Sequence, residues 1–272
     1  MAAARDDDAA DAMEPPVLRV PGDYPTVPEA AAAAQPGDTI EVGKGEHSWP
    51  GKIFVDKAFT VRGFRNRISG FPESFLRGRW QLCIPPPLPW DPDPKTLGKF
   101  VDVWCENESG CTINVVGGDW EFDNCRVLCS LGTALSVPRG NVVVLKSTVG
   151  ASKEIQPAIH GINVGEFGAV SAVQTAVRNC KCGVFMRSSA KLTMEASEVH
   201  RVLIALGCIL PNQCEVGVFS TRLHQYGALW HQSSRPTWLI QKGNYDEYGN
   251  PLHLHGEEDG KHYFQTQDLA SR

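Results

Sequence analysis

Acidic side chains alternate with aromatic ones in the segment Asp119-Trp-Glu-Phe-Asp123. In a strand, residues two apart share a face, so the three acids point outward if the two rings point into a core. Carboxylates grouped in this way can bind Ca²⁺ or act as an acid/base pair. Such a site needs a second acid on the neighbouring strand. The register derived below places Val144 beside Glu121 and Lys146 beside Asp123 on the next coil downstream, which predicts no catalytic pair on that side and leaves the upstream side open.

Cysteine and histidine spacings do not predict a metal site either. Cys180-Lys-Cys182 and Cys125-x-x-x-Cys129 lack a matching second pair at zinc-site spacing. His253-Leu-His255 lies in a stretch rich in turn residues and has no further ligands placed beside it. Nine cysteines, an odd number scattered through a long chain, indicate reduced thiols in a cytosol-like compartment. We therefore expect no metal or other cofactor, and a cytoplasmic protein.

Composition narrows the classes of partner. Of 272 residues, 42% are hydrophobic and 21% charged, as in soluble globular proteins. The net charge is −5 and no basic stripe occurs, so nothing favours binding to nucleic acid. Residues 1–16 are rich in Ala and Asp and predict an acidic disordered tail rather than a signal peptide. No run of 18 apolar residues follows, so we expect no membrane-spanning segment.

The elements that must position these residues form an internal repeat. Five short segments begin at residues 133, 160, 183, 202 and 227, and each follows a second short strand. Repeats of this length are typical of solenoids, in which stacking buries the apolar face of each unit. Short strands without intervening helices favour a parallel β-helix. We predict an all-β parallel β-helix over residues 17–234 and an irregular C-terminal tail over 235–272.

Stacking the repeats in register gives columns of mostly apolar residues. The column from the second strand is Leu135, Ile162, Phe185, Ile204 and Leu229. The columns from the first strand are Trp120, Val143, Val173, Leu192 and Val216, and then Phe122, Leu145, Thr175, Met194 and Val218. Parallel strands about 4.8 Å apart would make these columns continuous ladders inside the coil.

The same register predicts an apolar area on the outside of the last three coils. These candidate partner-binding residues are Val184, Met186, Leu203 and Trp230. A contiguous exposed apolar area generally indicates a contact, either with another protein or with the residues after 234 of the same chain. A register slip of one residue would turn the whole set inward.

A Pro-rich segment, residues 84–98, interrupts the coils. Its prolines exclude a helix or central strand and favour an extended polyproline-II loop. Such loops are ligands for other domains, which gives a second set of candidate partner-binding residues: Pro85, Pro86, Pro87, Leu88, Pro89 and Trp90. The alternative is a loop that packs on the rod through Trp90.

The N-terminal region combines a capping helix with a distinctive first coil. Thr26 can N-cap a short helix from Val27, which Gln35-Pro-Gly37 ends, and this helix is expected to cover the open end of the coils. The run Pro36-Gly-Asp-Thr-Ile-Glu-Val42, with Ile53-Phe-Val55 and Phe59-Thr-Val-Arg-Gly63, resembles the first coil of right-handed parallel β-helices of the pectin-lyase-like superfamily. It is most similar to the non-enzymatic repeats of F-box only proteins and of the SHC-SH2-domain-binding protein.

That resemblance rests on a coil signature. The matching positions are Ala30, Gly37, Asp38, Ile40, Val42, Gly45, Ile53, Val55, Lys57, Val61 and Gly63. His47 departs from it, since many relatives have an aromatic residue there. The resemblance implies a right-handed parallel β-helix with a short N-terminal capping helix and the Pro-rich loop as an insertion. It implies little about function, because the signature is not an active site.

Two functions compete on this fold. Many members of the superfamily cleave or de-esterify acidic polysaccharides, and His160-Gly161 resembles the His-Gly of polygalacturonases. The aspartate pair and Arg-x-Lys motif that should accompany it are missing, and His160 takes an inward position in our register. We therefore interpret the chain as a non-catalytic scaffold or protein–protein interaction module, a subunit of a larger complex. The alternatives are a carbohydrate-active enzyme, or a carbohydrate-binding module with Trp230 and Phe219 as its aromatic platforms.

Overall fold

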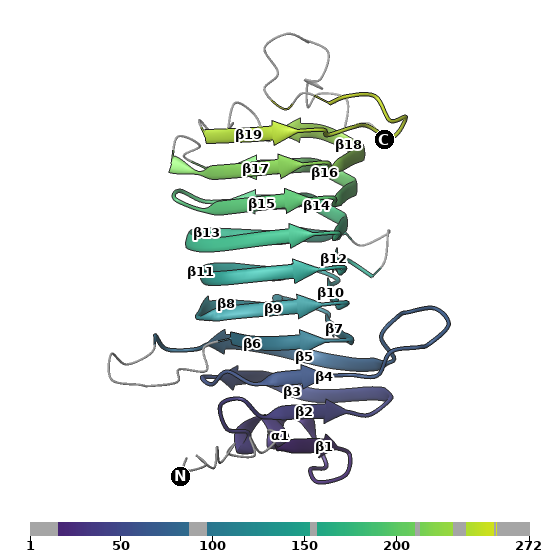
Figure 1. Ribbon diagram of the computed structural model, residues 1–272, viewed down its shortest axis with the longest axis vertical. Helices are drawn as coiled ribbons and strands as arrows, with labels where there is room; N and C mark the ends of the chain where they lie inside the picture. The colour runs from purple at the N-terminus through teal and green to yellow at the C-terminus, as the bar shows by residue number, and fades with distance from the viewer. Residues whose placement is uncertain are drawn as a thin grey trace, which may run out of the picture.

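The chain winds into a rod of stacked coils. The computed structural model describes residues 16–86, 97–152, 157–209, 213–230, 238–252 and 254. Within these residues, nineteen strands and one helix form about nine turns, with the helix α1 (Val27–Ala33) at the N-terminal end (Figure 1). The strands pair in parallel from one coil to the next. The prediction of an all-β parallel β-helix with a short capping helix is confirmed.

Three strand faces, here called A, B and C, run along the rod. Face A stacks β1 (Val17–Val20), β2 (Thr39–Val42), β4 (Thr60–Arg62), β6 (Leu97–Val101), β9 (Asp119–Asp123), the second halves of β11 (Thr133–Leu145) and β13 (Ala158–Val173), β15 (Lys191–Glu195), β17 (Glu215–Phe219) and β19 (Trp238–Lys242). Face B stacks the first parts of β3 (Gly45–Val55) and β5 (Ser74–Cys83), then β7 (Val103–Asn107), β10 (Arg126–Cys129), β12 (Thr148–Gly150), and the first parts of β14 (Ala176–Met186), β16 (Glu198–Cys208) and β18 (Arg222–Trp230).

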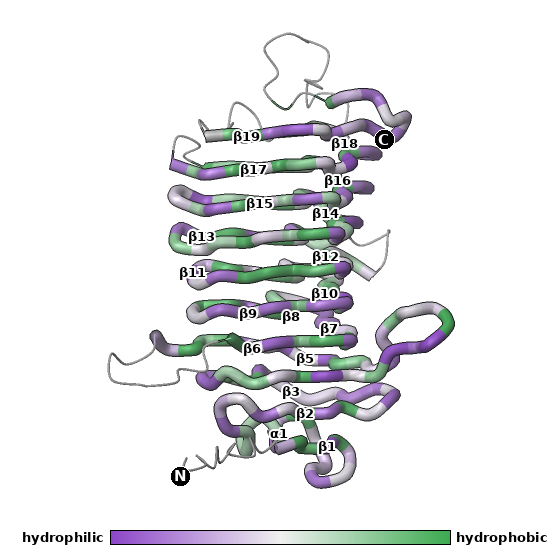
Figure 2. Tube along the Cα trace, viewed as in Figure 1, coloured by the Kyte–Doolittle hydropathy of each residue, from purple (hydrophilic) through white to green (hydrophobic). Residues whose placement is uncertain are grey.

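Face C uses the remaining halves of the long strands. It contains the second parts of β3 and β5, then β8 (Cys111–Gly117), the first halves of β11 and β13, and the second parts of β14, β16 and β18. Several long strands therefore bend at a corner and contribute one part to each of two faces. In Figure 2 hydrophobic residues recur along the stacked strands, and the turns at the edges of the rod are more hydrophilic.

The interior contains continuous ladders, but their register differs in part from the prediction. The ladder of face C is Leu135, Ile162, Val184, Leu206 and Trp230, and all five side chains are buried. On face A the ladders are Trp120, Val142, Val170, Leu192, Val216 and Leu239, and then Phe122, Val144, Ala172, Met194 and Val218. Burying each large apolar side chain contributes on the order of 1.5–3 kcal/mol, so these ladders are the main stabilising feature of the rod.

A recurrent corner joins face A to face B. In six successive coils one non-glycine residue takes the left-handed conformation, with φ between 46° and 56°: Asp102, Asn124, Lys146, Gln174, Ala196 and Ser220. After Lys146, Gln174 and Ala196, and after Gly243 at the same corner, the next residue is a buried polar one whose side chain bonds the backbone of the preceding coil. Ser197 Oγ accepts from Thr175 N at 3.1 Å, and Asn244 Oδ1 accepts from Thr221 N at 3.0 Å. Buried backbone donors at the corner are thereby satisfied.

The two ends of the rod are covered by different elements. At the N-terminal end α1 (Val27–Ala33) buries its apolar side, and Thr26 caps it by accepting from Glu29 N. At the other end β19 adds a rung beyond residue 234, so the coils extend past the boundary that the sequence predicted. Leu252 and Leu254 are then buried, and Trp230 Nε1 donates to the carbonyl oxygen of Leu254 at 3.1 Å. No helix in the described part of the chain is long and apolar enough to cross a membrane.

Candidate functional site

The three acids of β9 lie on the outer side of face A, because the two aromatic residues between them are buried. Lys99 Nζ lies 3.3 Å from Glu121 Oε1, and Asn141 Nδ2 donates to Asp119 Oδ1 at 2.7 Å. These partners come from neighbouring coils. Two of the acids therefore contact a lysine and an amide rather than another acid.

Ion pairs between coils recur along the outside of the rod. They include Arg19–Glu41, Arg77–Glu46 and Lys191–Glu215. In the last of these, Nζ lies 3.0 Å from Oε2, and the two residues are directly opposite each other in register. Exposed pairs contribute only about 0–1 kcal/mol each, but they neutralise outer carboxylates. No group of three or more His, Cys, Asp or Glu side chains that could hold a metal ion occurs among the described residues.

The apolar outer face predicted from the sequence is wrong in three of its four residues. Val184, Met186 and Trp230 are buried inside the coil, and only Leu203 is exposed. The predicted register stacked Phe185 on Ile162, whereas Val184 pairs with Ile162. Since side chains alternate between faces, this slip of one residue exchanged inside for outside.

The Pro-rich candidates lie mostly outside the described residues. Pro85 and Pro86 are described and exposed, directly after Ile84, which is buried and donates its N–H to Gly117 O. The remaining four, Pro87, Leu88, Pro89 and Trp90, fall in the segment 87–96 that the structure does not describe. Their predicted role in partner binding stays a prediction.

A polar groove, which the sequence analysis missed, lies on the outer surface where face C turns into face A. Six of its lining residues carry side chains that can contact a ligand: Ser136, Arg139, Asn163, Glu166, Phe167 and Arg187. The first two come from β11, the next three from β13, and Arg187 follows β14. The groove has a volume of about 560 Å³.

A β-bulge in β13 shapes this groove. The register between β11 and β13 shifts between Val137 and Arg139, so β13 carries one additional residue at the turn. Gly165 fits there because a Cβ atom on it would lie 2.4 Å from the Cα of Pro138. The additional residue leaves Glu166 and Phe167 exposed at the rim. Bulges commonly re-aim side chains in this way, and a glycine within a strand pattern is the signal that could have predicted it.

Three charged side chains of the groove have no partner of opposite charge in the described part of the chain. The guanidinium of Arg139 lies over the ring of Phe167, 5.5 Å from its centre. Within the described residues neither Arg139 nor Arg187 has an acidic partner, and Glu166 has no basic one. The buried Oδ1 atom of Asn163 has no hydrogen-bond partner there either. The groove therefore offers two cations and one carboxylate to a ligand.

His160 lies close to this groove and is only half-buried, so its predicted place in the core is wrong in part. Its ring stacks on Phe185 with a centroid distance of 5.0 Å, and its Nδ1 lies 3.4 Å from Thr133 Oγ1. Burial and the nearby Arg187 lower the pKa of His160. The imidazole of His160 therefore stays neutral down to a lower pH than that of an ordinary histidine.

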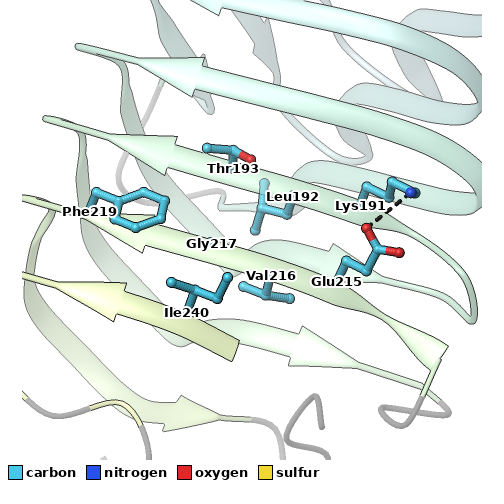
Figure 3. A pocket seen from close by; sticks show the side chains of 8 residues that line it. All are labelled: Lys191, Leu192, Thr193, Glu215, Val216, Gly217, Phe219 and Ile240. Carbon is cyan, nitrogen blue, oxygen red and sulfur yellow. Dashed lines mark ion pairs between the residues drawn. The ribbon is translucent and has the colours of Figure 1, made fainter. Parts of the chain in front are cut away.

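A second depression lies on face A near the C-terminal end (Figure 3). Gly217 forms its floor, and Thr193 and the exposed Ile240 lie beside it on the two neighbouring strands. Phe219 stands at one end and the Lys191–Glu215 ion pair at the other. A Cβ atom on Gly217 would lie 2.9 Å from the ring of Phe219, so the missing side chain makes room for the ring. Its surface is mostly apolar, and among its described lining residues only the paired Lys191 and Glu215 could act as an acid or base.

A charged cluster on the outer side of face B contains two stacked histidines. The rings of His200 and His224 are 5.0 Å apart and nearly parallel, and His224 Nε2 lies 2.5 Å from Glu198 Oε1. Burial lowers the pKa of His200, and Glu198 opposes this effect. His224, Arg178 and Arg222 lower it further.

We expect this cluster to make the protein less stable at acidic pH. Since the folded pKa of His200 lies below the unfolded value of about 6.5, the unfolded state binds more protons as the pH falls through that value. The free energy of unfolding should decrease by at most about 1.4 kcal/mol per pH unit for this proton. Urea unfolding of His200→Gln at pH 7.5 and 5.5 should show a smaller loss than the unchanged chain. An equal loss in both proteins would contradict the assignment.

Comparison with known proteins identifies the fold but no family. No family model and no curated protein matches the chain. Among solved structures, pectate lyase Pel9A matches with a TM-score of 0.52 and 14% identity over 85% of this chain and 73% of its own. A pectin methylesterase from Aspergillus niger matches with a TM-score of 0.49 and 12% identity, over 88% and 87% of the chains. Escherichia coli YbhC gives 0.45 and 11%, over 92% and 89%. The match to pectate lyase shows that the chain has the pectin-lyase-like parallel β-helix fold, and at this identity it shows the fold alone.

Proposed function

We propose that this chain is a non-catalytic β-helix that binds other proteins in the cytoplasm as a subunit of a larger complex, and that its polar groove takes an acidic protein segment. The observation that carries the proposal is the grouping of two unpaired cations. Arg139 and Arg187 line one groove, and neither has an acidic partner among the described residues. Arginine pairs with carboxylates through strong charge-assisted hydrogen bonds.

The mixed charge of the groove favours a protein segment over a polysaccharide of repeated uronic acids. Glu166 lies in the same groove as the two arginines and would repel a uniform polyanion, while a lysine of a protein segment can pair with it. The net charge of −5 adds to that repulsion, so binding of an acidic segment depends on these local cations. The resemblance of the first coil to the repeats of F-box only proteins and of the SHC-SH2-domain-binding protein is consistent with a non-enzymatic role.

The rival function is a polysaccharide lyase, hydrolase or pectin esterase. This rival function is supported by the similarity in fold to pectate lyase, but a fold alone does not specify a function, because many unrelated functions share one fold. Side chains on face A do not favour it, since Glu121 and Glu215 are each bound to a lysine.

We expect Arg139→Gln together with Arg187→Gln to weaken binding of a Glu-rich peptide that contains one lysine by tenfold or more. Each lost hydrogen bond to a charged group costs about 1.5–3 kcal/mol, and about 1.4 kcal/mol corresponds to a factor of ten in affinity. Isothermal titration at low ionic strength measures the affinity. The difference between the proteins should shrink as salt is added, because exposed charges are then screened.

The matched control replaces Arg77 and Lys191, two cations that already have acidic partners, with Gln. It removes the same net charge and should leave the affinity nearly unchanged. If the control weakens binding as much as the groove variant, the attraction is general and the groove is not the site. Cleavage of polygalacturonate, or release of methanol from pectin, by the unchanged chain would instead support the rival function.

A further inference from the structure

Two cysteines lie at either end of the connection from face C to face A in one coil. Cys208 ends β16 and pairs with Met186, and Cys214 directly precedes β17. Their Sγ atoms are 2.8 Å apart, and both side chains are buried. Unbonded carbon atoms pack at about 3.5–4.0 Å and a disulfide bond is about 2.05 Å long. The two sulfur atoms are thus closer than ordinary packing brings them.

Hydrogen bonds give the two thiols different chemical characters. Cys208 Sγ donates to Cys214 Sγ, and Cys214 Sγ lies 3.0 Å from the carbonyl oxygen of Arg187. The hydrogen bond from Cys208 lowers the pKa of Cys214, although burial opposes it. The same hydrogen bond, together with burial, raises the pKa of Cys208. Since the thiolate is the nucleophile, Cys214 is the attacking sulfur and Cys208 the resolving one.

We propose that Cys208 and Cys214 are a site of reversible disulfide formation with a peroxide as the oxidant. The Cys214 thiolate attacks one peroxide oxygen and breaks the O–O bond, and the other oxygen leaves as water with the proton that Cys214 has released. Cys208 then attacks the sulfenic sulfur, and its proton leaves with the hydroxyl group as a second water. Two thiols are oxidised to one disulfide, and the peroxide is reduced to two molecules of water. Reducing thiols of the cytosol would reverse the bond.

Two other buried cysteines provide an internal comparison. Cys180 and Cys182 lie two residues apart on β14, and their Sγ atoms donate to the carbonyl oxygens of Arg178 and Val184. Burial raises the pKa of Cys180, and it raises the pKa of Cys182 to about 12. Both thiols therefore stay protonated at neutral pH and are poor nucleophiles.

The test uses the full chain, reduced and then exposed to one equivalent of hydrogen peroxide. The protein is unfolded, its free thiols are alkylated, and it is digested with trypsin before mass spectrometry. Cys208 and Cys214 fall in one tryptic peptide, residues 202–222. We expect this peptide to be lighter by two hydrogens and unlabelled, whereas Cys180 and Cys182 are labelled. A reductant added before alkylation should restore both labels in the peptide.

A second measurement follows the melting temperature. A disulfide that closes so short a loop should raise it by about 5 °C or more, and reductant should abolish the rise. Cys214→Ser should show no such rise. The proposal is overturned if Cys208 and Cys214 take label after peroxide as fully as Cys180 and Cys182, or if either is found bonded to another chain. Should Cys214→Ser fail to fold, the masses of the unchanged chain decide the question alone.

Discussion

Replacing Leu206 with Asp is expected to prevent the chain from folding. Leu206 is fully buried and pairs with Val184 on one side and Trp230 on the other in the ladder of face C. A carboxylate there would have no partner and no water, which costs more than about 4–5 kcal/mol. That is a large part of the roughly 5–15 kcal/mol by which a native protein is stable. Circular dichroism and size-exclusion chromatography should show loss of strand structure and aggregation.

The matched control is the same change three residues earlier on the same strand. Leu203 is 46% exposed, so Leu203→Asp should alter the free energy of unfolding by no more than about 0.5 kcal/mol. The pair tests the register directly, because the two leucines differ in the side of the coil to which they point. A soluble, cooperatively melting Leu206→Asp protein, or an unfolded Leu203→Asp protein, would contradict the ladder.

Removing residues 243–272 is expected to destabilise the rod on the order of 5 kcal/mol. The truncation exposes the surface that Leu252 and Leu254 cover, worth about 1.5–3 kcal/mol for each leucine. It also removes the acceptor of the Trp230 indole and Asn244, which bonds the backbone of Thr221. Chemical unfolding should show the loss, and a dye that binds apolar surfaces should fluoresce with the truncated protein.

The control for this truncation is a chain that ends at His255. It keeps Leu252, Leu254 and their contacts, so it should melt like the full chain and bind no additional dye. If removal of residues 243–272 is equally harmless, these residues do not act as a cap. The expected cap lies at the end of the rod, whereas the sequence analysis considered the residues after 234 as one of two alternative covers for the outer face.

The sequence predicts the fold well because several strands alternate strictly. In β9, β15 and β17 every second residue is buried, and the predicted stacking of Leu192 on Val216 and of Met194 on Val218 is correct. The prediction fails where a strand bends between two faces. Cys182, Gly183 and Val184 are all buried in β14, so alternation cannot fix the register through the bend. The wrong positions of Phe185, Ile204 and Leu229 follow from that.

The candidate groove could not be predicted from periodicity, because a departure from periodicity creates it. One additional residue in β13 re-aims Glu166 and brings Phe167 opposite Arg139. Arg187 joins them from a different coil, 20 residues away along the chain. Gly165 indicates the bulge in the sequence, but it does not predict which side chains lie beside the two arginines. Similarly, the cysteine count indicated reduced thiols, and only the folded geometry brings Cys208 to Cys214.

The left-handed corner has a consequence for protein engineering. From Asp102 to Gly243, successive corner residues are 22, 22, 28, 22, 24 and 23 positions apart, so coil length varies while the corner recurs. Gly150 pairs with Arg178 of the next coil, and Ala158 pairs with Cys180. The longest interval therefore has six more residues between Gly150 and Ala158 than the next coil has between Arg178 and Cys180. Stacking continues undisturbed on both sides of it. A foreign peptide inserted between Gly150 and Ala158 would therefore lengthen one turn without changing the strand register of the neighbouring coils. The chain could thus serve as a scaffold that displays an inserted peptide at this position.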